Sequence, residues 1–337
     1  MQRAQIHVAA ADALEELHEG NLGEHAGELA YHFSQAKTIS GPEKLVRYSL
    51  MAGEHSLDAH AHEEALAMFQ QGMAAKEGHE MDADSASLLF GLGRAQLATL
   101  GRSQIPEALG NLDRAFEYFT ASGDVERAVA VAEHPLPNLV ALNTGAIKRI
   151  SRALEMVPPD SRTAGRLLSM LGRIAGYDDG DYEASQSAFS RALEIARRKD
   201  DPALELTTLA GESYVNMWHC RWQEILDKTP RAIDLARTVD DPAGELLALC
   251  AAEITTGHRE AAWWHVSEGI ILAEKLRDRL LLCGTLYRVA WVAGLEGDWQ
   301  TVRDVSDQGL ELLPMDPRLL ATRTLVEYQL GEFEQGA

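Results

Sequence analysis

Two stretches of this chain, 40 residues apart, decide its fold class. LEIARRKDDPALE (193–205) aligns without a gap with IDLARTVDDPAGE (233–245), and both carry the same Asp-Asp-Pro-Ala segment. Aspartate at the N-cap followed by proline in the first turn is a typical helix start, because proline has no amide hydrogen to leave unbonded there. The two stretches therefore predict a helix end and a helix start at equivalent places in two copies of a repeated unit.

The rest of the sequence is also helical in pattern. Apolar residues recur at spacings of three and four along segments such as 84–100 and 185–198, and runs of alternating β-branched residues are absent. About eighteen helices joined by short turns account for the length. The sequence predicts an all-α fold.

One register extends the repeated unit along the whole chain. Anchor residues, placed just after the turn inside each helical hairpin, recur every 34 to 43 residues: His62, Ile105, Asn143, Tyr182, Trp222, Arg259, Trp299 and Phe333. Ten residues beyond each of the first seven anchors, the residue is small: Gly72, Ala115, Ala153, Ala192, Ala232, Gly269 and Gly309. A small residue there allows the second helix of a hairpin to pack closely on its neighbour. The register predicts an α-solenoid with about seven full repeats of 37–43 residues and an incomplete last hairpin.

Two repeats depart from this pattern. Pro230 falls in the middle of the second helix of the fifth hairpin, where it removes a hydrogen bond and predicts a kink or a split, with Thr229-Pro230 as a new helix start. Pro135 and Pro137 fall in the first helix of the third repeat. Both positions predict bends in the solenoid.

These residues carry a resemblance to a known family. The hairpin AGEHSLDAHAHEEALAMFQQG (52–72) resembles a tetratricopeptide repeat (TPR), with Gly53, Ala65, Phe69 and Gly72 at the family's small and aromatic positions and His62 in place of its tyrosine. The resemblance implies a right-handed superhelix of helical hairpins whose first helices line a concave face.

A longer version of the repeat, near 40 residues, fits segments 180–198 and 297–312. That version is common in bacterial signal-transduction ATPases, large LuxR-type regulators and ATPase-linked adenylate cyclases. Segments 3–17, 25–36 and 43–57 resemble the part of such regulators where the ATPase module passes into the TPR array. The resemblance implies a helical pair over 1–40 and the superhelical array over 41–337.

Composition and charge exclude several classes of function. The 337 residues carry 52 acidic and 31 basic side chains, a net charge of −21, which argues against a nucleic-acid groove and leaves basic segments as candidate partners. No stretch is long and apolar enough for a membrane span. Cys220, Cys250 and Cys283 form no CxxC pair and are interpreted as reduced thiols of a cytoplasmic protein. The chain contains no GxxxxGK[ST] motif, and so no ATPase of that type.

No motif for catalysis or metal binding is found. The histidines concentrate before residue 80, but neither HExxH nor a converging set of three ligands is visible, and His219-Cys220 lacks further ligands. The acidic segment 177–183 is interpreted as an inter-helix turn rather than a calcium loop. We therefore expect no enzyme activity, no cofactor and no metal.

Aromatic residues in the Trp-rich hairpins, 207–300, are the candidate binding residues. All six tryptophans lie between 218 and 299. The candidates lie on the first helices of the fifth and seventh hairpins, where they form either inter-repeat core or the wall of a shallow groove: Tyr214, Met217, Trp218, Tyr287 and Trp291. Trp263 and Trp264 are adjacent on one helix, so at least one of them is expected to be exposed or at an interface.

Two functions remain open from the sequence. The first is a non-catalytic interaction module of bacterial signalling or transcription regulation, whose concave groove binds a peptide or protein partner such as an ATPase or regulator domain. The second is a small-ligand sensor that uses the Trp-rich hairpins. The half hairpin at 332–337 leaves an apolar face that is also compatible with a homodimer.

Overall fold

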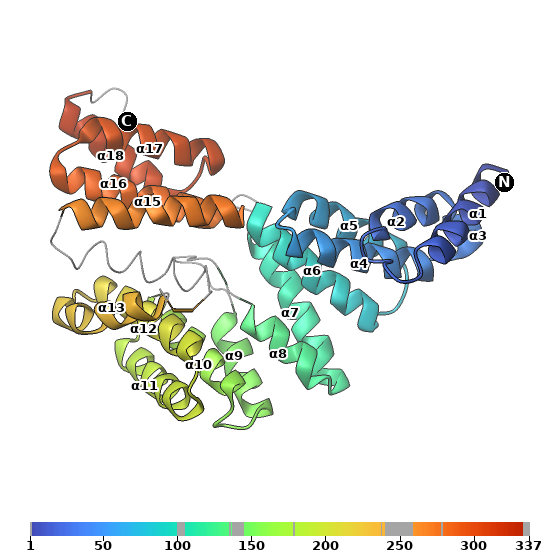
Figure 1. The fold of residues 1–337 in the computed structure, drawn as a ribbon, viewed down its shortest axis with the longest axis horizontal. Coiled ribbons are helices and arrows are strands. Elements are labelled where there is room, and N and C mark those ends of the chain that lie inside the picture. Colours follow the sequence, from blue (N-terminus) through green and yellow to red (C-terminus); the bar gives the residue numbers. More distant parts are fainter. Residues whose placement is uncertain are drawn as a thin grey trace. The chain divides into compact units, whose positions relative to one another are not determined.

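The computed structural model describes residues 2–99, 105–134, 136, 145–177, 179–236, 238–239, 259–277 and 279–332. Within these residues it contains seventeen α-helices and no strand (Figure 1), which confirms the all-α fold. The chain divides into two compact units, Met1–His134 and Pro135–Ala337. This division differs from the boundary at 40/41 that the resemblance implies, and that boundary stays a prediction.

The first unit contains eight of these helices: α1 (Gln2–Leu17), α2 (Ala26–Gln35), α3 (Lys37–Ser40), α4 (Glu43–Asp58), α5 (His62–Ala75), α6 (Ala83–Thr99), α7 (Ile105–Ser122) and α8 (Val125–Glu133). Its core contains Phe33, Tyr48 and Phe69, all fully buried. The ring of Phe33 stacks on that of Tyr48, with centroids 5.6 Å apart. Apolar side chains from α1, α2, α4, α5 and α6 thus share one core, so residues 1–40 pack directly on the hairpins that follow.

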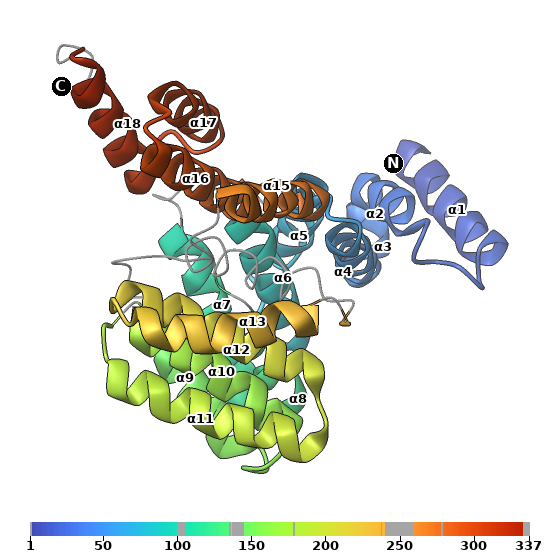
Figure 2. The same cartoon turned by 60° about the vertical axis from the view of Figure 1, so that its left-hand side comes forward.

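The second unit contains the remaining helices: α9 (Ala146–Met156), α10 (Arg162–Tyr177), α11 (Tyr182–Lys199), α12 (Pro202–Trp218), α13 (Trp222–Ala236), α15 (Arg259–Leu276), α16 (Arg279–Glu296), α17 (Trp299–Leu312) and α18 (Pro317–Leu330). Figures 1 and 2 both place α10 to α13 side by side. Consecutive helices pair as antiparallel hairpins, α10 with α11, α12 with α13 and α16 with α17. The same pairing joins α4 with α5 and α6 with α7 in the first unit.

The sequence register corresponds to the observed helix boundaries. Six anchors are the first residues of α5, α7, α11, α13, α15 and α17, whereas Asn143 and Phe333 lie outside the described residues. At two of the turns that precede them, Gly180 and Gly297 have φ of 72° and 76°, a conformation that favours glycine. Asp181 and Asp298 then cap the helices by accepting hydrogen bonds from backbone amides three residues on.

The small residues of the register are all buried at helix contacts. A Cβ atom on Gly72 would lie 2.5 Å from Cδ2 of Leu88, and one on Gly309 would lie 2.5 Å from Cδ1 of Leu319. Both distances are far below van der Waals contact. A larger side chain at either position would therefore push the second helix of the hairpin away from the next helix.

Pro230 does not divide the helix in which it lies. α13 runs without a break from Trp222 to Ala236, so the predicted split with a new helix start at Thr229 is wrong. Ala232 and Leu235, on the turns after the proline, are buried against Leu206 and Leu209 of α12. This packing of the turns after Pro230 offsets one missing hydrogen bond, because helical stability in proteins comes mainly from the buried face.

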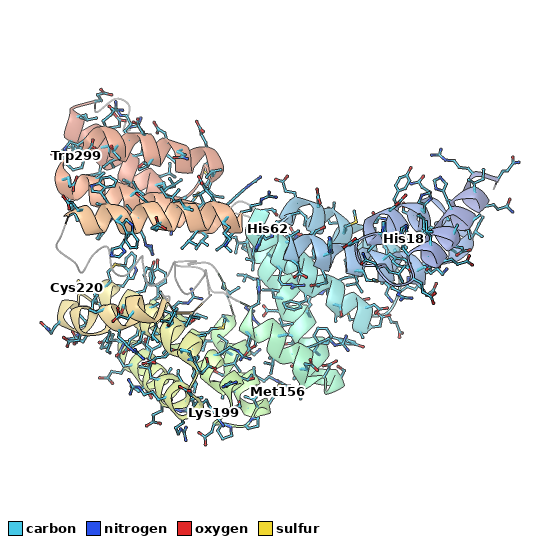
Figure 3. All side chains as sticks on the ribbon, viewed as in Figure 1. His18, His62, Met156, Lys199, Cys220 and Trp299 are labelled. Carbon is cyan, nitrogen blue, oxygen red and sulfur yellow. The ribbon has the colours of Figure 1, made fainter. Side chains whose placement is uncertain are left out.

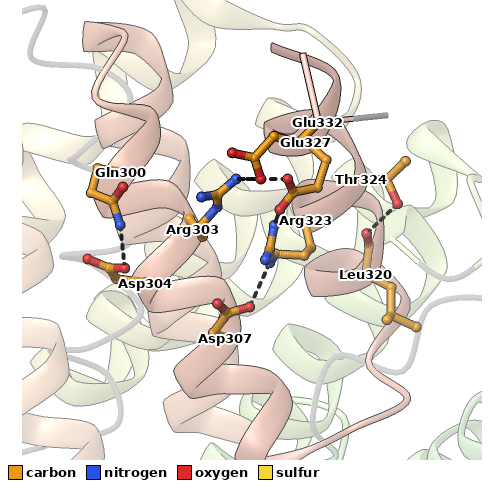
Figure 4. A network of polar contacts seen from close by, with 9 residues as sticks. All are labelled: Gln300, Arg303, Asp304, Asp307, Leu320, Arg323, Thr324, Glu327 and Glu332. Carbon is orange, nitrogen blue, oxygen red and sulfur yellow. Dashed lines mark hydrogen bonds and ion pairs between the residues drawn. The ribbon is translucent and has the colours of Figure 1, made fainter. Parts of the chain in front are cut away.

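An ionic network joins α17 to α18 near the end of the described chain (Figure 4). Glu327 is 1% exposed and accepts a hydrogen bond of 2.8 Å from Nη2 of Arg303. Its other carboxylate oxygen pairs with Arg323, which also donates from Nε to Asp307 at 2.6 Å. Arg303 reaches Glu332 at 2.8 Å as well. The buried carboxylate thus lies between two guanidinium groups and links the two helices.

The carboxyl group of Asp82, just before α6, is expected to make the stability of the fold depend on pH. Partial burial alone would raise the pKa of Asp82, but hydrogen bonds from Lys76 and Ser85 outweigh it and lower the pKa to about 2. Because the pKa is lower in the folded state, the stabilisation is present above the usual value of 3.8 and is lost as the pH falls toward 2. We expect the melting temperature of the wild type to exceed that of Asp82→Asn at pH 5, and this gap to close by about pH 2. Circular dichroism measures both; a gap that does not change with pH would contradict the prediction.

Candidate binding site

Aromatic side chains from α10 and α12 meet near the ends of these helices. The ring centroid of Tyr177, the last residue of α10, lies 5.0 Å from those of Tyr214 and Trp218 on α12. Tyr214 and Trp218 are one helical turn apart, with centroids at 6.4 Å. Tilted and edge-to-face contacts of this kind are favourable for aromatic rings. The three rings form one contiguous group.

A second aromatic pair lies on α16. The ring centroids of Tyr287 and Trp291 are 6.3 Å apart. Tyr214 and Trp291 are equivalent in the repeat, because each precedes the first residue of the next helix by eight positions. The same place in two hairpins thus carries a large aromatic side chain.

Two arginines join these groups. The guanidinium of Arg288 on α16 lies over the ring of Tyr214, 5.1 Å from its centroid, and that of Arg318 on α18 lies 5.7 Å from the centroid of Tyr287. Both distances are within the range of cation–π attraction. We call the five aromatic residues and these two arginines the aromatic cluster: Tyr177, Tyr214, Trp218, Tyr287, Trp291, Arg288 and Arg318.

The cluster combines a buried part with an exposed part. Tyr214 is buried, whereas Trp218 and Trp291 are each 45% exposed. Tyr214 therefore packs as core, and the two indoles offer surface to solvent; that they form the wall of a groove stays a prediction. Met217 is half-buried, and within the described part of the chain it takes part in none of the contacts that join the cluster.

The electrostatics of the cluster follow from burial and from the arginines. Burial raises the pKa of the Tyr177 hydroxyl, the neighbouring Tyr214 adds to this, and the positive charges of Arg318 and Arg288 partly oppose it. Burial likewise raises the pKa of Tyr287, against a hydrogen bond from Trp291 and the same two arginines. Tyr177 and Tyr287 are therefore neutral at physiological pH, and both lie close to the guanidinium groups of Arg288 and Arg318.

Arg318 is held in place by the residue that caps its own helix. Asp316 accepts hydrogen bonds from Nε and Nη2 of Arg318 at 3.1 and 2.7 Å, and from the backbone amide of Arg318 at 2.9 Å. Burial alone would raise the pKa of Asp316, but the hydrogen bonds and charge of Arg318 lower it. The bidentate geometry fixes the plane of the guanidinium.

Three members of the cluster were not predicted from the sequence. Tyr177 belongs to the acidic segment 177–183, whose other residues indicated a turn, and Arg318 follows an Asp-Pro pair that indicated only a helix start. Arg288 carries no motif. Its position next to Tyr287 is informative only once α12 and α16 are known to approach each other.

The other described tryptophans and Cys220 are not part of the aromatic cluster. Trp263 is half-buried and donates to Glu296 at 3.0 Å, while Trp264 is 52% exposed, as expected for adjacent residues on one helix. Trp299 packs partly buried against Ala290 and Val302; the side chain of Trp222 lies outside the described residues. Figure 3 marks Trp299 and the exposed Cys220 among the side chains.

The histidines form contacts with one another and with the backbone. His7 and His32 approach within 3.0 Å between their Nδ1 atoms, and the rings of His18 and His25 stack with centroids at 3.5 Å. His219 bonds through Nε2 to the carbonyl of Gly176 at 2.7 Å. Across the described ranges, no group of three or more histidine, cysteine or carboxylate side chains is arranged to hold a metal ion. None of the helices in those ranges is long and apolar enough to cross a membrane.

Comparisons with known proteins place this arrangement among helical-repeat folds. Neither the available protein-family models nor the curated protein sequences give a match. The structure of a Rap protein complexed with Competence and Sporulation Factor is similar over 99% of this chain and 95% of its own, with 13% sequence identity and a TM-score of 0.58. This likeness supports the fold.

Two further structures carry the repeat in their descriptions. A signal-transduction ATPase with a tetratricopeptide-repeat sensor, from Pyrococcus horikoshii, is similar over 98% of this chain and 50% of its own, with 16% identity and a TM-score of 0.47. The present chain thus spans about half the length of that protein. The C-terminal part of a TPR-containing protein from Cytophaga hutchinsonii matches over 93% of this chain and 98% of its own, with 12% identity and a TM-score of 0.35. The likeness to the Rap structure agrees with the paired helices and the buried small residues. The chain is an all-α array of TPR-like helical hairpins.

Proposed function

We propose that the chain is a non-catalytic interaction module that binds a peptide segment of a partner protein at the aromatic cluster. The observation that carries this proposal is the pair of half-exposed indoles, Trp218 and Trp291, each next to a tyrosine: Trp218 to the buried Tyr214 and Trp291 to Tyr287. Large aromatic side chains that keep one face exposed are enriched at binding sites, because they offer contact area at a small entropic cost. Arrays of stacked hairpins present extended surfaces suited to such segments.

The biological setting of the module is part of the proposal. The resemblance of segments 3–17, 25–36 and 43–57 to the junction of ATPase and repeat array supports a role in bacterial signalling or transcription regulation. The Rap protein of similar fold was solved with the Competence and Sporulation Factor, which supports partner binding as a use of this architecture. An ATPase or regulator domain, or a second copy of the chain, is the candidate partner.

A selection experiment tests whether the aromatic cluster binds peptides. A random peptide library is displayed and selected on the full chain, and each binder is then measured on the double variant Trp218→Ala/Trp291→Ala. We expect binders whose affinity falls at least about tenfold in the double variant, the loss typical of central aromatic contacts. Trp264→Ala is the matched control, since this indole is as exposed but lies outside the cluster. Binders that do not distinguish the two variants would place the binding surface elsewhere.

The second candidate function is a small-ligand sensor that uses the Trp-rich hairpins. The observation in its favour is that the cluster sets two guanidinium groups and neutral tyrosine hydroxyls beside indole rings. A metabolite that binds there should quench tryptophan fluorescence and raise the melting temperature of the wild type but not of the double variant. A metabolite screen without any such response, together with cluster-dependent peptide binding, would exclude the sensor.

A further inference from the structure

Four histidines form two pairs that bridge α1 and α2. His7 of α1 and His32 of α2 approach within 3.0 Å between their Nδ1 atoms, with ring centroids 5.0 Å apart. His18, directly after α1, stacks on His25, directly before α2, with centroids at 3.5 Å. All four side chains are half-buried, so they can still exchange protons with solvent. The contact between α1 and α2 thus contains one imidazole pair in the first half of α1 and one just past its end.

Neither pair accommodates two protonated rings without a loss of stability. A hydrogen bond between two Nδ1 atoms needs a hydrogen on one and a lone pair on the other, so at least one of His7 and His32 is neutral. A further proton would break this bond and bring two positive charges together. It would also put like charges on the stacked rings of His18 and His25. Each pair therefore binds fewer protons while α1 is docked than after its release.

No carboxylate is placed to balance charge on these imidazoles. The other titratable and charged groups around the pairs come from four helices and the connection between α1 and α2: Arg3, Asp12, Glu15 and Glu16 of α1, Glu19 and Glu24 of the connection, Glu28 and Tyr31 of α2, Lys37 of α3, and Lys44, Arg47 and Tyr48 of α4. Tyr31 contacts His7 and His32 through ring edges. Among the residues that the structure describes, none of these carboxylates is ion-paired with any of the four histidines.

Apolar packing contributes little to the docking of α1. Ala11 is its one buried residue in the described range 2–17, and Leu14 is partly buried against the same core. The remaining anchors are polar, since Lys44 of α4 bonds Asp12 at 2.9 Å and Glu15 at 2.6 Å. Segments with few buried apolar contacts are released locally before the rest of a fold opens. The polar contacts, including the two histidine pairs, therefore decide whether α1 stays docked.

We propose that the two histidine pairs make the docking of α1 sensitive to pH, so that α1 is held on α2 near neutral pH and released as the pH falls below about 6.5, where histidine ordinarily gains its charge. Because the released state binds more protons, docking strengthens as the pH rises and weakens as it falls. One proton fewer in a docked pair changes the docking equilibrium by up to about tenfold per pH unit. This response lies in the first unit, apart from the aromatic cluster of the second.

Hydrogen–deuterium exchange of the full chain, read out by mass spectrometry at about pH 7.5 and about pH 5.5, measures the docking of α1. Protection factors correct for the effect of pH on intrinsic exchange, and EDTA in every sample removes metal ions that paired imidazoles could bind. We expect the protection of segment 2–17 to fall at least about tenfold at the lower pH, and that of α7 in the same unit to change less than about twofold. Unchanged protection of segment 2–17, or an equal fall in both segments, would overturn the proposal.

Variants that keep one imidazole in each pair test whether the histidines are the cause. In His7→Gln/His18→Gln, and in His25→Gln/His32→Gln, the protection of segment 2–17 should change less than about twofold between the two pH values. The two variants remove opposite members of each pair, so an effect peculiar to one substitution is recognised by comparison with the other.

His55→Gln/His79→Gln is the matched control, because both of these histidines are exposed and lie outside α1 and α2. It should keep the tenfold fall of the wild type. A tenfold fall that persists in both variants of the pairs would overturn the proposal, and so would its loss in the control.

Discussion

Replacing Phe69 with alanine is expected to destabilise the first unit by about 3–5 kcal/mol, the cost typical of removing a fully buried aromatic ring. The ring lies directly against two helices that carry glycine at the contact. A Cβ atom on Gly53 of α4 would lie 2.5 Å from Cε1 of Phe69, and one on Gly91 of α6 would lie 2.3 Å from the same atom. The glycines thus make room for this ring, and its loss leaves a cavity that neither can fill.

Two spectroscopic probes can distinguish unfolding of the first unit from unfolding of the second. All six tryptophans lie in the second unit, so tryptophan fluorescence reports on that unit, whereas circular dichroism reports on every helix. Urea unfolding of Phe69→Ala should show the circular dichroism transition beginning at a lower concentration than in the wild type. Tyr31→Ala, which removes an exposed ring of the same unit, should cost less than about 1 kcal/mol. Equal effects of the two variants would contradict the packing role of Phe69.

Glu327→Ala is expected to destabilise the end of the array by about 3–5 kcal/mol, because it leaves Arg303 and Arg323 close together with no carboxylate between them. The two guanidinium groups keep some contact with water, which places the expected cost near the lower end of this range. Urea unfolding followed by tryptophan fluorescence measures the change, since Trp299 begins α17, the helix that Arg303 joins to Glu327 of α18.

Glu332 provides the matched control for this prediction. It also binds Arg303 at 2.8 Å, but it is 41% exposed. Exposed ion pairs contribute about 0–1 kcal/mol, so Glu332→Ala should cost no more than that. A Glu327→Ala variant as stable as Glu332→Ala would show that burial of the carboxylate is not what links α17 to α18.

The repeat could be predicted from the sequence because its cause is local and recurrent. Helix starts are marked by aspartate caps such as Asp181 and Asp298, and close helix packing requires small residues such as Ala192 and Gly309. The anchor residues recur every 34 to 43 residues, so one register located six helix starts. The prediction of a split at Pro230 is wrong because it considered the one lost hydrogen bond but not the packing of α13 on α12.

The candidate site could be predicted only in part. Trp218 and Trp291 stand out in the sequence because tryptophan is rare and the repeat register assigns both to first helices. Arg288 and Arg318 do not, because single arginines are common and their role depends on the approach of α16 to α12 and of α18 to α16. The overall charge of −21 favours basic partners, which stays a prediction, because a sum over the chain contains no information on where charges gather.

The most direct test of the account is hydroxyl-radical labelling of the full chain with and without a saturating selected peptide, read out by mass spectrometry at each tryptophan. Oxidation of an indole depends on its exposure to solvent, and Trp218, Trp291 and Trp264 are about equally exposed in the free protein. We expect the peptide to protect Trp218 and Trp291 and to leave Trp264 unchanged. Protection of Trp264 alone, or no change at Trp218 and Trp291, would contradict binding at the aromatic cluster.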